Sequence, residues 1–557
     1  MYIGDIAFEV EILDKPYVFS EERTYAQTAR IAFIDTSENV LKKTEYAVVP
    51  EEDIYAKIEK GEDINLDNCY VNNFSLSKYR KNKELASNAS VSIQNFSAEK
   101  AFFEAGDTID FSFASFEGNK AHFLKATFGN GNLSFYKCKF GDMPVDFSEA
   151  ILGKGHTNFQ YVDFSKGNKT FEKAHNFGNL SFVNTNFGVG RVNFKETSFG
   201  AGNIEFQYAK FGKGDISFDK ATFRGLRVDF KRVEFGDGKL DFRRTDFGNA
   251  NVSFEETEYG KGRKSFRRAI FGNGNVNFHL ANFGEEDVNF ETAIFGNGNL
   301  NFFESISGEL NFKTCHLNNY IDFRVEKCNK INLANTLVRD VIDFKTGYSS
   351  VHIKELNITG MRNLGKFIID WNENKVESMI ENQEGSTNKQ KAEQFRILKE
   401  DFHSSGQYND EDEAYVRFKR YELKHLHKAR LEEKKSNAIW AYPMKWSEQL
   451  IFDKMGVYAT NPVRVLVSML ITYVLFSFLY YAMIHTGHGD LRPGFDPPEQ
   501  MSEMALSFYH SAITFLTIGY GDYAPWGIIR AISSIEGFVG LFMMSYFTVA
   551  FVRKILR

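Results

Sequence analysis

The segment 199–223 reads FGAGNIEFQYAKFGKGDISFDKATF and repeats phenylalanine at alternating steps of seven and five residues. The same steps begin at Phe111 and, after one slip near Phe177, continue to Phe302 with a period of twelve residues. An α-helix repeats its apolar residues about every 3.6 positions and a strand about every two, so neither element alone explains this spacing. The pattern predicts a coiling chain that turns a corner after every short extended segment.

The residue two positions before each phenylalanine is also restricted. It is mostly aliphatic in the seven-step halves, as at Ile204 and Ile216, and small or β-branched in the five-step halves, as at Ala209 and Ala221. Residues i and i−2 of an extended segment point to the same side, so both positions are predicted to line one interior. The seven-step halves also carry Gly-x-Gly, which we expect to supply corners with positive φ.

The five-step halves resemble the pentapeptide-repeat family, whose motif has a small residue two places before a central Phe or Leu; the seven-step halves depart from it. The resemblance implies a right-handed, four-sided β-helix. Two periods then form a coil of about 24 residues, with a coil of about twelve as the alternative. At about 4.8 Å between stacked strands, roughly seven or eight coils give a rod of about 35–40 Å. Beyond Phe302 the steps shorten, which indicates a degenerating terminal coil.

Composition excludes several classes of protein. The chain has 557 residues, 25% of them charged, and a net charge of −6, which rules out a disordered chain and a strongly basic nucleic-acid binder. Segment 123–302 holds 24 Lys/Arg against 21 Asp/Glu, too neutral for a DNA mimic, so no nucleic-acid partner is expected. The cysteines form no CxxC pair, which argues against a disulfide framework or zinc ribbon and favours a reducing compartment: Cys69, Cys138, Cys315 and Cys328. The first residues have no signal-peptide pattern.

Two apolar segments near the C-terminus are long enough to cross a membrane. Segment 465–484 contains twenty residues without a charge. Segment 537–552, extended upstream to Ile528, is the second, with Arg530 near its outer end and Glu536 inside it. A helix rises about 1.5 Å per residue, so about twenty residues span the hydrocarbon core. The sequence therefore predicts two membrane-spanning helices.

Between these segments lies TIGYGD, residues 517–522, which resembles the selectivity filter of potassium channels; Ile518 replaces the commoner Val. An extended chain of L-residues points alternate carbonyls in opposite directions. Glycine at alternate positions can adopt left-handed dihedrals and bring the carbonyls into line, so we expect this of Gly519 and Gly521.

The resemblance implies a role for each filter residue. The carbonyls of Thr517, Ile518, Gly519 and Tyr520, with the Thr517 hydroxyl, would bind K⁺. Tyr520 would brace the filter against the preceding pore helix, and Asp522 would lie at the outer mouth. The helix around 507–515 would direct its partly negative C-terminal end at a cation.

Two residues of the second span are harder to assign. Gly540 lies where related channels have a hinge glycine, and close helix packing is the alternative. Glu536 is an acid inside a membrane segment, which suggests a function. A structural bond to the pore helix is at least as good an explanation, so its role stays open.

A filter of one strand per chain cannot surround an ion, so the channel interpretation requires a homotetramer in membrane lipid. Basic residues flank the spans on their terminal sides, and the loop between them is acidic, so both termini are expected in the cytoplasm at the cell (inner) membrane. The residues used are Lys445, Lys454, Arg464, Arg553, Lys554 and Arg557 on the flanks, with Asp490, Asp496, Glu499 and Glu503 against Arg492 in the loop.

The chain is thus predicted to be multidomain: an accessory or cap region (1–95), a β-helix solenoid (96–350), a helical connector (351–440), an amphipathic interfacial helix (441–461) and a two-span pore domain (462–557). The connector is expected to contain a helical hairpin that stops at Gly406 and restarts near Asn409. Trp446, Leu450, Ile451 and Met455 mark the apolar face of the interfacial helix.

The sequence predicts a potassium-selective channel, gated or assembled through its β-helix. No catalytic constellation or resident cofactor is expected, and no helix has the arginine spacing of a voltage sensor. A gating ligand or protein partner on the cytoplasmic part is expected but not identified. Two alternatives remain: a membrane-tethered solenoid scaffold with a vestigial pore, and a poorly selective cation channel.

Overall fold

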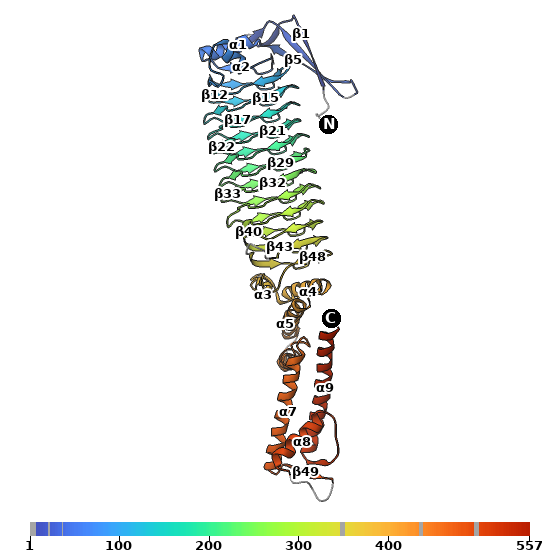
Figure 1. Ribbon diagram of the computed structural model, residues 1–557. Coiled ribbons are helices and arrows are strands. Elements are labelled where there is room, and N and C mark those ends of the chain that lie inside the picture. Colours follow the sequence, from blue (N-terminus) through green and yellow to red (C-terminus); the bar gives the residue numbers. More distant parts are fainter. Residues whose placement is uncertain are drawn as a thin grey trace. The chain divides into compact units, whose positions relative to one another are not determined.

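A computed structural model describes residues 7–20, 23–35, 37–345, 351–433, 438–494 and 501–556. Asp496, Glu499 and Arg557, used above to predict orientation, lie outside these ranges. The chain divides into two compact units, Met1–Glu384 and Gly385–Arg557, and each is described by itself. The first unit is a parallel β-solenoid with an antiparallel sheet at one end, and the second is helical (Figure 1).

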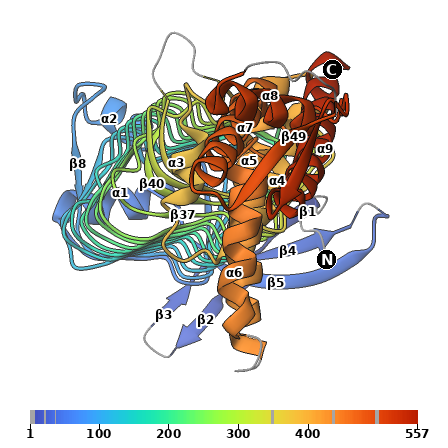
Figure 2. The same cartoon turned by 90° about the horizontal axis from the view of Figure 1, so that it is seen from below.

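The solenoid is built from short parallel strands stacked coil upon coil. One coil contains β25 (Ile204–Glu205), β26 (Lys210–Phe211), β27 (Ile216–Ser217) and β28 (Thr222–Phe223). Each pairs with its counterpart in the next coil, as in Ile204↔Val228 and Ile216↔Leu240. One coil therefore takes two periods of the sequence repeat, as predicted, and the alternative of one period per coil is wrong. Figure 2, turned by 90°, shows the coils superposed on one another.

The stack is longer than the phenylalanine spacing indicates. A thirteen-stranded sheet runs from β6 (Ile64–Asn65) to β46 (His352–Asn357). A twelve-stranded sheet runs from β11 (Thr108–Asp110) to β48 (Lys366–Ile368). Coils thus begin before residue 96 and continue past residue 350, in place of the seven or eight expected. The outer coils keep the backbone pairing while other apolar side chains replace phenylalanine in their interior.

Columns of stacked phenylalanine rings fill the solenoid. Rings at equivalent places in successive coils, such as Phe206 and Phe230, lie nearly parallel with centroids 4.8 Å apart. A neighbouring column of rings meets this column edge-on, as where the planes of Phe206 and Phe218 cross at 84°. All three side chains are fully buried. Aromatic pairs ordinarily prefer offset or edge-on contact, so the strand spacing, about 4.8 Å, imposes the parallel stacking.

The slip near Phe177 is a one-residue deletion. Ile151 pairs with His175 in the ordinary register, whereas Thr157 pairs with Leu180, one position short of that register. Asn176, which lies just before the deletion, takes the interior position that Phe199 holds in the next coil, and is 1% exposed.

The glycines of Gly-x-Gly mostly do not supply the positive φ that we expected. Gly190 does, at 113°, but Gly212 and Gly214 do not. Positive φ falls instead on the second residue after a phenylalanine, such as Tyr208 (61°) and Lys220 (58°). The expectation was wrong because the constraint is space: a Cβ at Gly214 would lie 1.7 Å from the carbonyl oxygen of Gly190.

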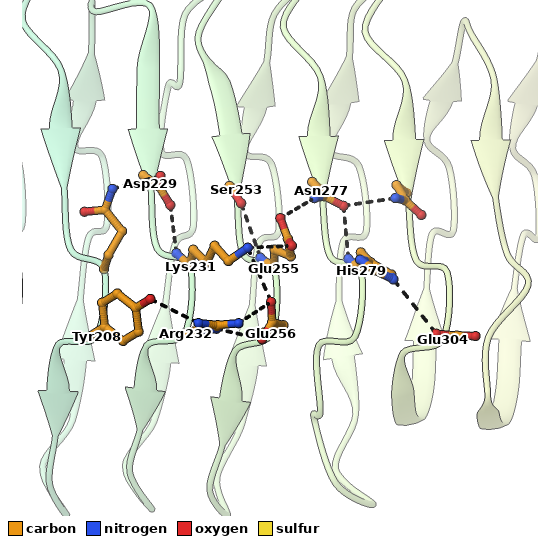
Figure 3. A network of polar contacts seen from close by, with 12 residues as sticks. Tyr208, Asp229, Lys231, Arg232, Ser253, Glu255, Glu256, Asn277, His279 and Glu304 are labelled. Atoms are coloured by element: carbon orange, nitrogen blue, oxygen red, sulfur yellow. Dashed lines mark hydrogen bonds and ion pairs between the residues drawn. The ribbon is translucent and has the colours of Figure 1, made fainter.

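Polar side chains pair along the outside of the stack. Lys231 bonds Glu255 at 2.7 Å, and Arg232 bonds Glu256 at 2.7 Å. Each pair joins neighbouring coils, and Arg232 also contacts the Tyr208 hydroxyl of the preceding coil at 3.1 Å (Figure 3). The outer surface thus repeats with the same period as the core.

An antiparallel sheet covers the N-terminal coils. It contains β1 (Ala7–Leu13), β4 (Thr28–Ile34) and β5 (Val40–Val48), and continues into the parallel strands β7 (Cys69–Asn72) and β10 (Phe102–Glu104). Two helices, α1 (Glu51–Lys60) and α2 (Leu76–Asn82), and a hairpin of β2 (Tyr17–Ser20) and β3 (Arg23–Tyr25) complete the region. Phe8, Phe33 and Tyr46 pack around Phe102, so this sheet caps the aromatic interior.

Helices make up most of the second unit. After α3 (Val376–Glu381) of the first unit come α4 (Asn388–Ser404), α5 (Tyr408–Glu433) and α6 (Ala438–Glu448). They are followed by the π-helical turn η2 (Gln449–Lys454), then α7 (Pro462–His485), α8 (Glu503–Phe515) and α9 (Ile529–Ile555). The antiparallel pair of β49 (Gly489–Pro493) and β50 (Tyr523–Gly527) joins the segments before and after α8.

The helical hairpin lies where the sequence predicts it. Thr387 and Gln390 form a capping box at the start of α4, and Gly406, with φ of 74°, follows its end. Among the described residues, α7 and α9 are the two helices long and apolar enough to cross a membrane, in agreement with the predicted spans.

Candidate ion-conduction site

Helices α7, α8 and α9 pack together and position the predicted filter, residues 517–522. The Ser502 side chain caps α8 by accepting a hydrogen bond from the Ala505 amide. Helix α8 ends at Phe515, two residues before Thr517. The predicted filter therefore follows directly from the C-terminal end of a short helix held between the two apolar helices.

The backbone of the predicted filter alternates in handedness. Thr517, Gly519 and Gly521 have φ of 58°, 59° and 78°, whereas Ile518 and Tyr520 are not among the residues with positive φ. We expected positive φ at the two glycines; its occurrence at Thr517 was not expected. Alternating signs of φ turn successive carbonyls toward the same side, which an ordinary strand cannot do.

The predicted filter is exposed on a single chain. Ile518 is 47% and Tyr520 is 70% exposed. Tyr520 is therefore not packed against α8 of its own chain, and its implied role of bracing the filter against a pore helix stays a prediction. The contact with α8 is made instead by Asp522, whose Oδ2 accepts a hydrogen bond of 2.5 Å from the Tyr509 hydroxyl.

The β49–β50 strand pair holds the chain that follows Asp522. The amide of Gly494 donates to the Asp522 carbonyl at 2.7 Å, and Arg492 lies over the Trp526 ring at 3.9 Å. Arg530 covers the same ring at 4.9 Å. The end of the predicted filter is thus held by α8 on one side and by the β49–β50 strand pair on the other.

Behind α8, the acid Glu536 of α9 is fully buried. Its Oε1 accepts a hydrogen bond from Ser511 of α8, and its Oε2 accepts one of 2.6 Å from the Tyr480 hydroxyl of α7. One turn further along α9, a Cβ at Gly540 would lie 2.0 Å from the Phe515 carbonyl oxygen. Close packing, the alternative for Gly540, therefore has a direct basis in this structure, and its role as a hinge stays a prediction.

The C-terminal end of α9 is held by the first turns of α5. Asp412 bonds Arg553 at 2.9 Å and Lys554 at 2.8 Å, and Arg553 lies 4.4 Å from the centroid of the Tyr415 ring. A further ion pair joins Arg420 of α5 to Asp453 of η2 at 2.8 Å. The connector hairpin is thus attached to the end of the second apolar helix.

The interfacial segment combines α6 and η2. Trp446 is 66% exposed, and Leu450 is also exposed, whereas Ile451 and Met455 are half-buried. The helix does not stay regular over 441–461, because it turns into the π-helical η2 at Gln449.

Three contact residues were not predicted from the sequence: Tyr509, Ser511 and Tyr480. Each contacts a residue that the sequence had singled out, Asp522 or Glu536. Ser511 lies within the segment predicted as a pore helix, and a bond from that helix to Glu536 was one of the two explanations considered. Nothing in the sequence indicated Tyr480, because the rotation of α7 was unknown.

Among the described residues no group of three His, Cys, Asp or Glu side chains could hold a metal ion. This finding does not bear on the predicted filter, because backbone carbonyls are its expected ligands.

Comparison with known proteins supports the class of this site. Residues 468–557 match the model of the Ion_trans_2 family, described as an ion channel. Protein LctB of Bacillus caldotenax is 28% identical over 109 residues, which cover 19% of this chain and 75% of that protein. No solved structure matches the chain. The C-terminal part is therefore an ion-channel pore domain with two apolar helices, preceded by other helices and a parallel β-solenoid.

Proposed function

We propose that this chain is one subunit of a homotetrameric, potassium-selective channel in the cell (inner) membrane, with both termini in the cytoplasm. One observation carries the proposal: φ is positive at Thr517, Gly519 and Gly521, in an exposed segment directly after a short helix and between two apolar helices. Alternating handedness is what a backbone needs to present a row of carbonyls to an ion.

Conduction is passive in this proposal. K⁺ exchanges its hydration shell for carbonyls of residues 517–520 contributed by four chains around one axis. The partly negative C-terminal end of α8 stabilises a cation that approaches the filter. Asp522, fixed by Tyr509, stays beside the filter and adds negative charge near its end.

Exposed apolar side chains support the tetramer. Ile518 and Tyr520 are large side chains that a single chain leaves uncovered. A cavity of about 510 Å³ between α7 and α8 is lined almost entirely by apolar residues, among them Leu470, Tyr473 and Phe515. In the proposed assembly, neighbouring copies cover these surfaces.

The solenoid is proposed to gate or assemble the channel, through a ligand or protein partner not yet identified. Its place in the chain supports this, because it leads into the connector, and the connector contacts the end of α9 through Asp412. The proposal includes no enzymatic activity or cofactor, and K⁺ is the transported ion.

The first test is cation flux in liposomes that contain the purified full-length protein. We expect K⁺ flux well above Na⁺ flux, and its loss in Gly521→Ala. Gly487→Ala is the matched control: both glycines have positive φ, 78° and 73°, and at both a Cβ would meet open space, but Gly487 lies outside the filter.

Three other outcomes would overturn parts of the proposal. Equal K⁺ and Na⁺ flux would remove the selectivity and favour a poorly selective channel. Full K⁺ flux in Gly521→Ala would exclude the predicted filter as the conduction path. No flux in the wild type across a range of voltage, pH and Ca²⁺ would favour the scaffold alternative.

A further inference from the structure

Glu536 is the point at which the three helices of the pore domain meet. Its side chain belongs to α9, and its two carboxyl oxygens accept hydrogen bonds from different helices, Ser511 of α8 and Tyr480 of α7. All three residues are fully buried. A polar group inside a membrane segment is costly unless it is bonded, so this arrangement fixes the rotation of each helix relative to the others.

A second set of polar contacts lies beside the first. The Ser533 hydroxyl, almost one turn before Glu536 on α9, lies 2.9 Å from Nε2 of His510 and 3.3 Å from the Tyr480 hydroxyl. His510 and Ser511 are consecutive residues of α8. Two neighbouring residues of the short helix are therefore bonded to two residues on one face of α9.

The contact continues toward the predicted filter. Gly540 lies one turn beyond Glu536, and its Cα approaches the Phe515 carbonyl so closely that a Cβ would come within 2.0 Å of the oxygen. Residues 536 and 540 of α9 thus lie along residues 511 and 515 of α8. Phe515 ends α8 two residues before Thr517, so a displacement of α9 must either move the base of the filter or break these contacts.

We propose that Glu536 is a positioning residue that fixes α8 to α9 and thereby sets the ion selectivity of the filter. It never contacts the ion: it acts through Ser511 and the end of α8. This inference rests on the proposed potassium conduction. It adds that selectivity depends on a carboxyl group behind the filter as well as on the TIGYGD backbone.

The test compares permeability ratios, measured as reversal potentials with K⁺ and Na⁺ on opposite sides of a planar bilayer. Glu536→Gln keeps the shape of the side chain but replaces one accepting oxygen with a donor. Ser511→Ala and Tyr480→Phe each remove one donor. We expect each variant to lower the K⁺/Na⁺ permeability ratio by about tenfold, the equivalent of one buried hydrogen bond.

The matched control is Ser534→Ala, which removes an exposed hydroxyl of α9 that bonds only its own helix, at Arg530. We expect its permeability ratio to equal that of the wild type. Combining Tyr480→Phe with Glu536→Gln should lower the ratio by less than the product of the two single effects, because both remove the same contact.

An unchanged permeability ratio in Glu536→Gln, with a lowered melting temperature, would make Glu536 a purely structural residue and overturn the inference. The proposed function would survive that outcome, because the wild type would still select K⁺. A wild type without selectivity would instead contradict the proposed function itself.

Discussion

Gly214 illustrates why the repeat needs glycine at a position whose backbone dihedral angles any residue could adopt. Its φ is not positive, yet a Cβ would lie 1.7 Å from the Gly190 carbonyl oxygen of the coil below. The corner brings the backbones of successive coils together at a distance that excludes any side chain. Sequence periodicity located the glycine correctly but not the reason for it, because spacing between coils is not visible in one period.

We predict that Gly214→Ala destabilises the solenoid by about 1–3 kcal/mol, because the coil must shift to admit the methyl group. Gly106→Ala is the control, since a Cβ there meets no atom within 4 Å and φ is not positive. Urea unfolding of the full-length protein, followed by the far-ultraviolet β signal, measures both. Equal midpoints for the two variants would contradict the steric explanation.

Two lysines replace aliphatic residues in the interior of the solenoid. Lys169 stands between Val145 and Val192, and its ammonium group donates to the carbonyls of Ser165 (3.0 Å) and Val189 (2.9 Å). Burial lowers its pKa from 10.5 to about 8. Lys264 is buried in the same way, with its pKa lowered by the same cause. The phenylalanine pattern did not indicate either residue.

Lys169 makes stability depend on pH. Between pH 8 and pH 10.5 the folded chain has released this proton while the unfolded chain still holds it, so the free energy of unfolding should rise with pH across that window. The rise should total about 3 kcal/mol. Urea midpoints of Lys169→Met should show a smaller rise, because Lys264 still contributes, and those of the exposed Lys210→Met should keep the full rise. An undiminished rise in Lys169→Met would assign the effect to other groups.

At the residue scale the sequence predicted a filter at residues 517–522 but not the side-chain contacts around it. TIGYGD is a contiguous motif, so its position could be predicted without any tertiary information. The bonds of Glu536 depend on how α7 and α8 are rotated, which the weakly amphipathic apolar segments do not encode. For the same reason Tyr509 could not be paired with Asp522 in advance.

Among the elements, α5 and α9 form the contact with the clearest functional consequence. Arg553 and Lys554 place two positive charges at the end of each α9, and Asp412 bonds both. In a tetramer these ends would surround the cytoplasmic mouth of the pore. In the proposed tetramer, Asp412 would therefore offset a positive field that repels entering cations.

We predict that Asp412→Asn lowers the single-channel K⁺ conductance, and more strongly at low salt, since charges are screened over about 10 Å at 0.1 M and about 30 Å at 0.01 M. Glu432→Gln is the control, because it removes an equal charge from the same helix in an exposed pair with Lys428. Conductance measured in planar bilayers across KCl concentrations tests the prediction. A loss of the same size at every concentration would rule out an electrostatic cause.

Elements with strong local signals were predictable. The helical hairpin could be placed because Gly406 separates two periodic segments, and the spans because they are long, apolar and carry few charges. The first coils, from Ile64, could not be recognised because residues such as Ile64, Leu66 and Val71 fill their interior in place of regularly spaced phenylalanine. Backbone pairing, which defines a coil, tolerates any apolar side chain of suitable volume.

For the whole molecule, the proposed function fixes the number of chains. We predict that the full-length protein purified in detergent has a protein mass of four times 63.9 kDa, measured by light scattering with the detergent contribution removed. The reason is geometric, since one chain exposes Ile518 and Tyr520 and cannot surround an ion by itself. A protein mass of one or two chains under conditions that support flux would contradict the proposal.

The constant register between coils has a consequence for how such a chain can change in length. Each coil contacts only the coils before and after it, and Phe206 and Phe230 occupy equivalent places in successive coils. Loss of residues 206–229 would join Glu205 to Phe230 and leave every remaining strand paired with its counterpart in the adjoining coil. Duplication of residues 206–229 would add one coil with the same pairing. Either event changes the stack by about 4.8 Å and leaves both of its ends intact, so genetic insertion and deletion in whole coils can adjust the reach of the domain in small, equal increments.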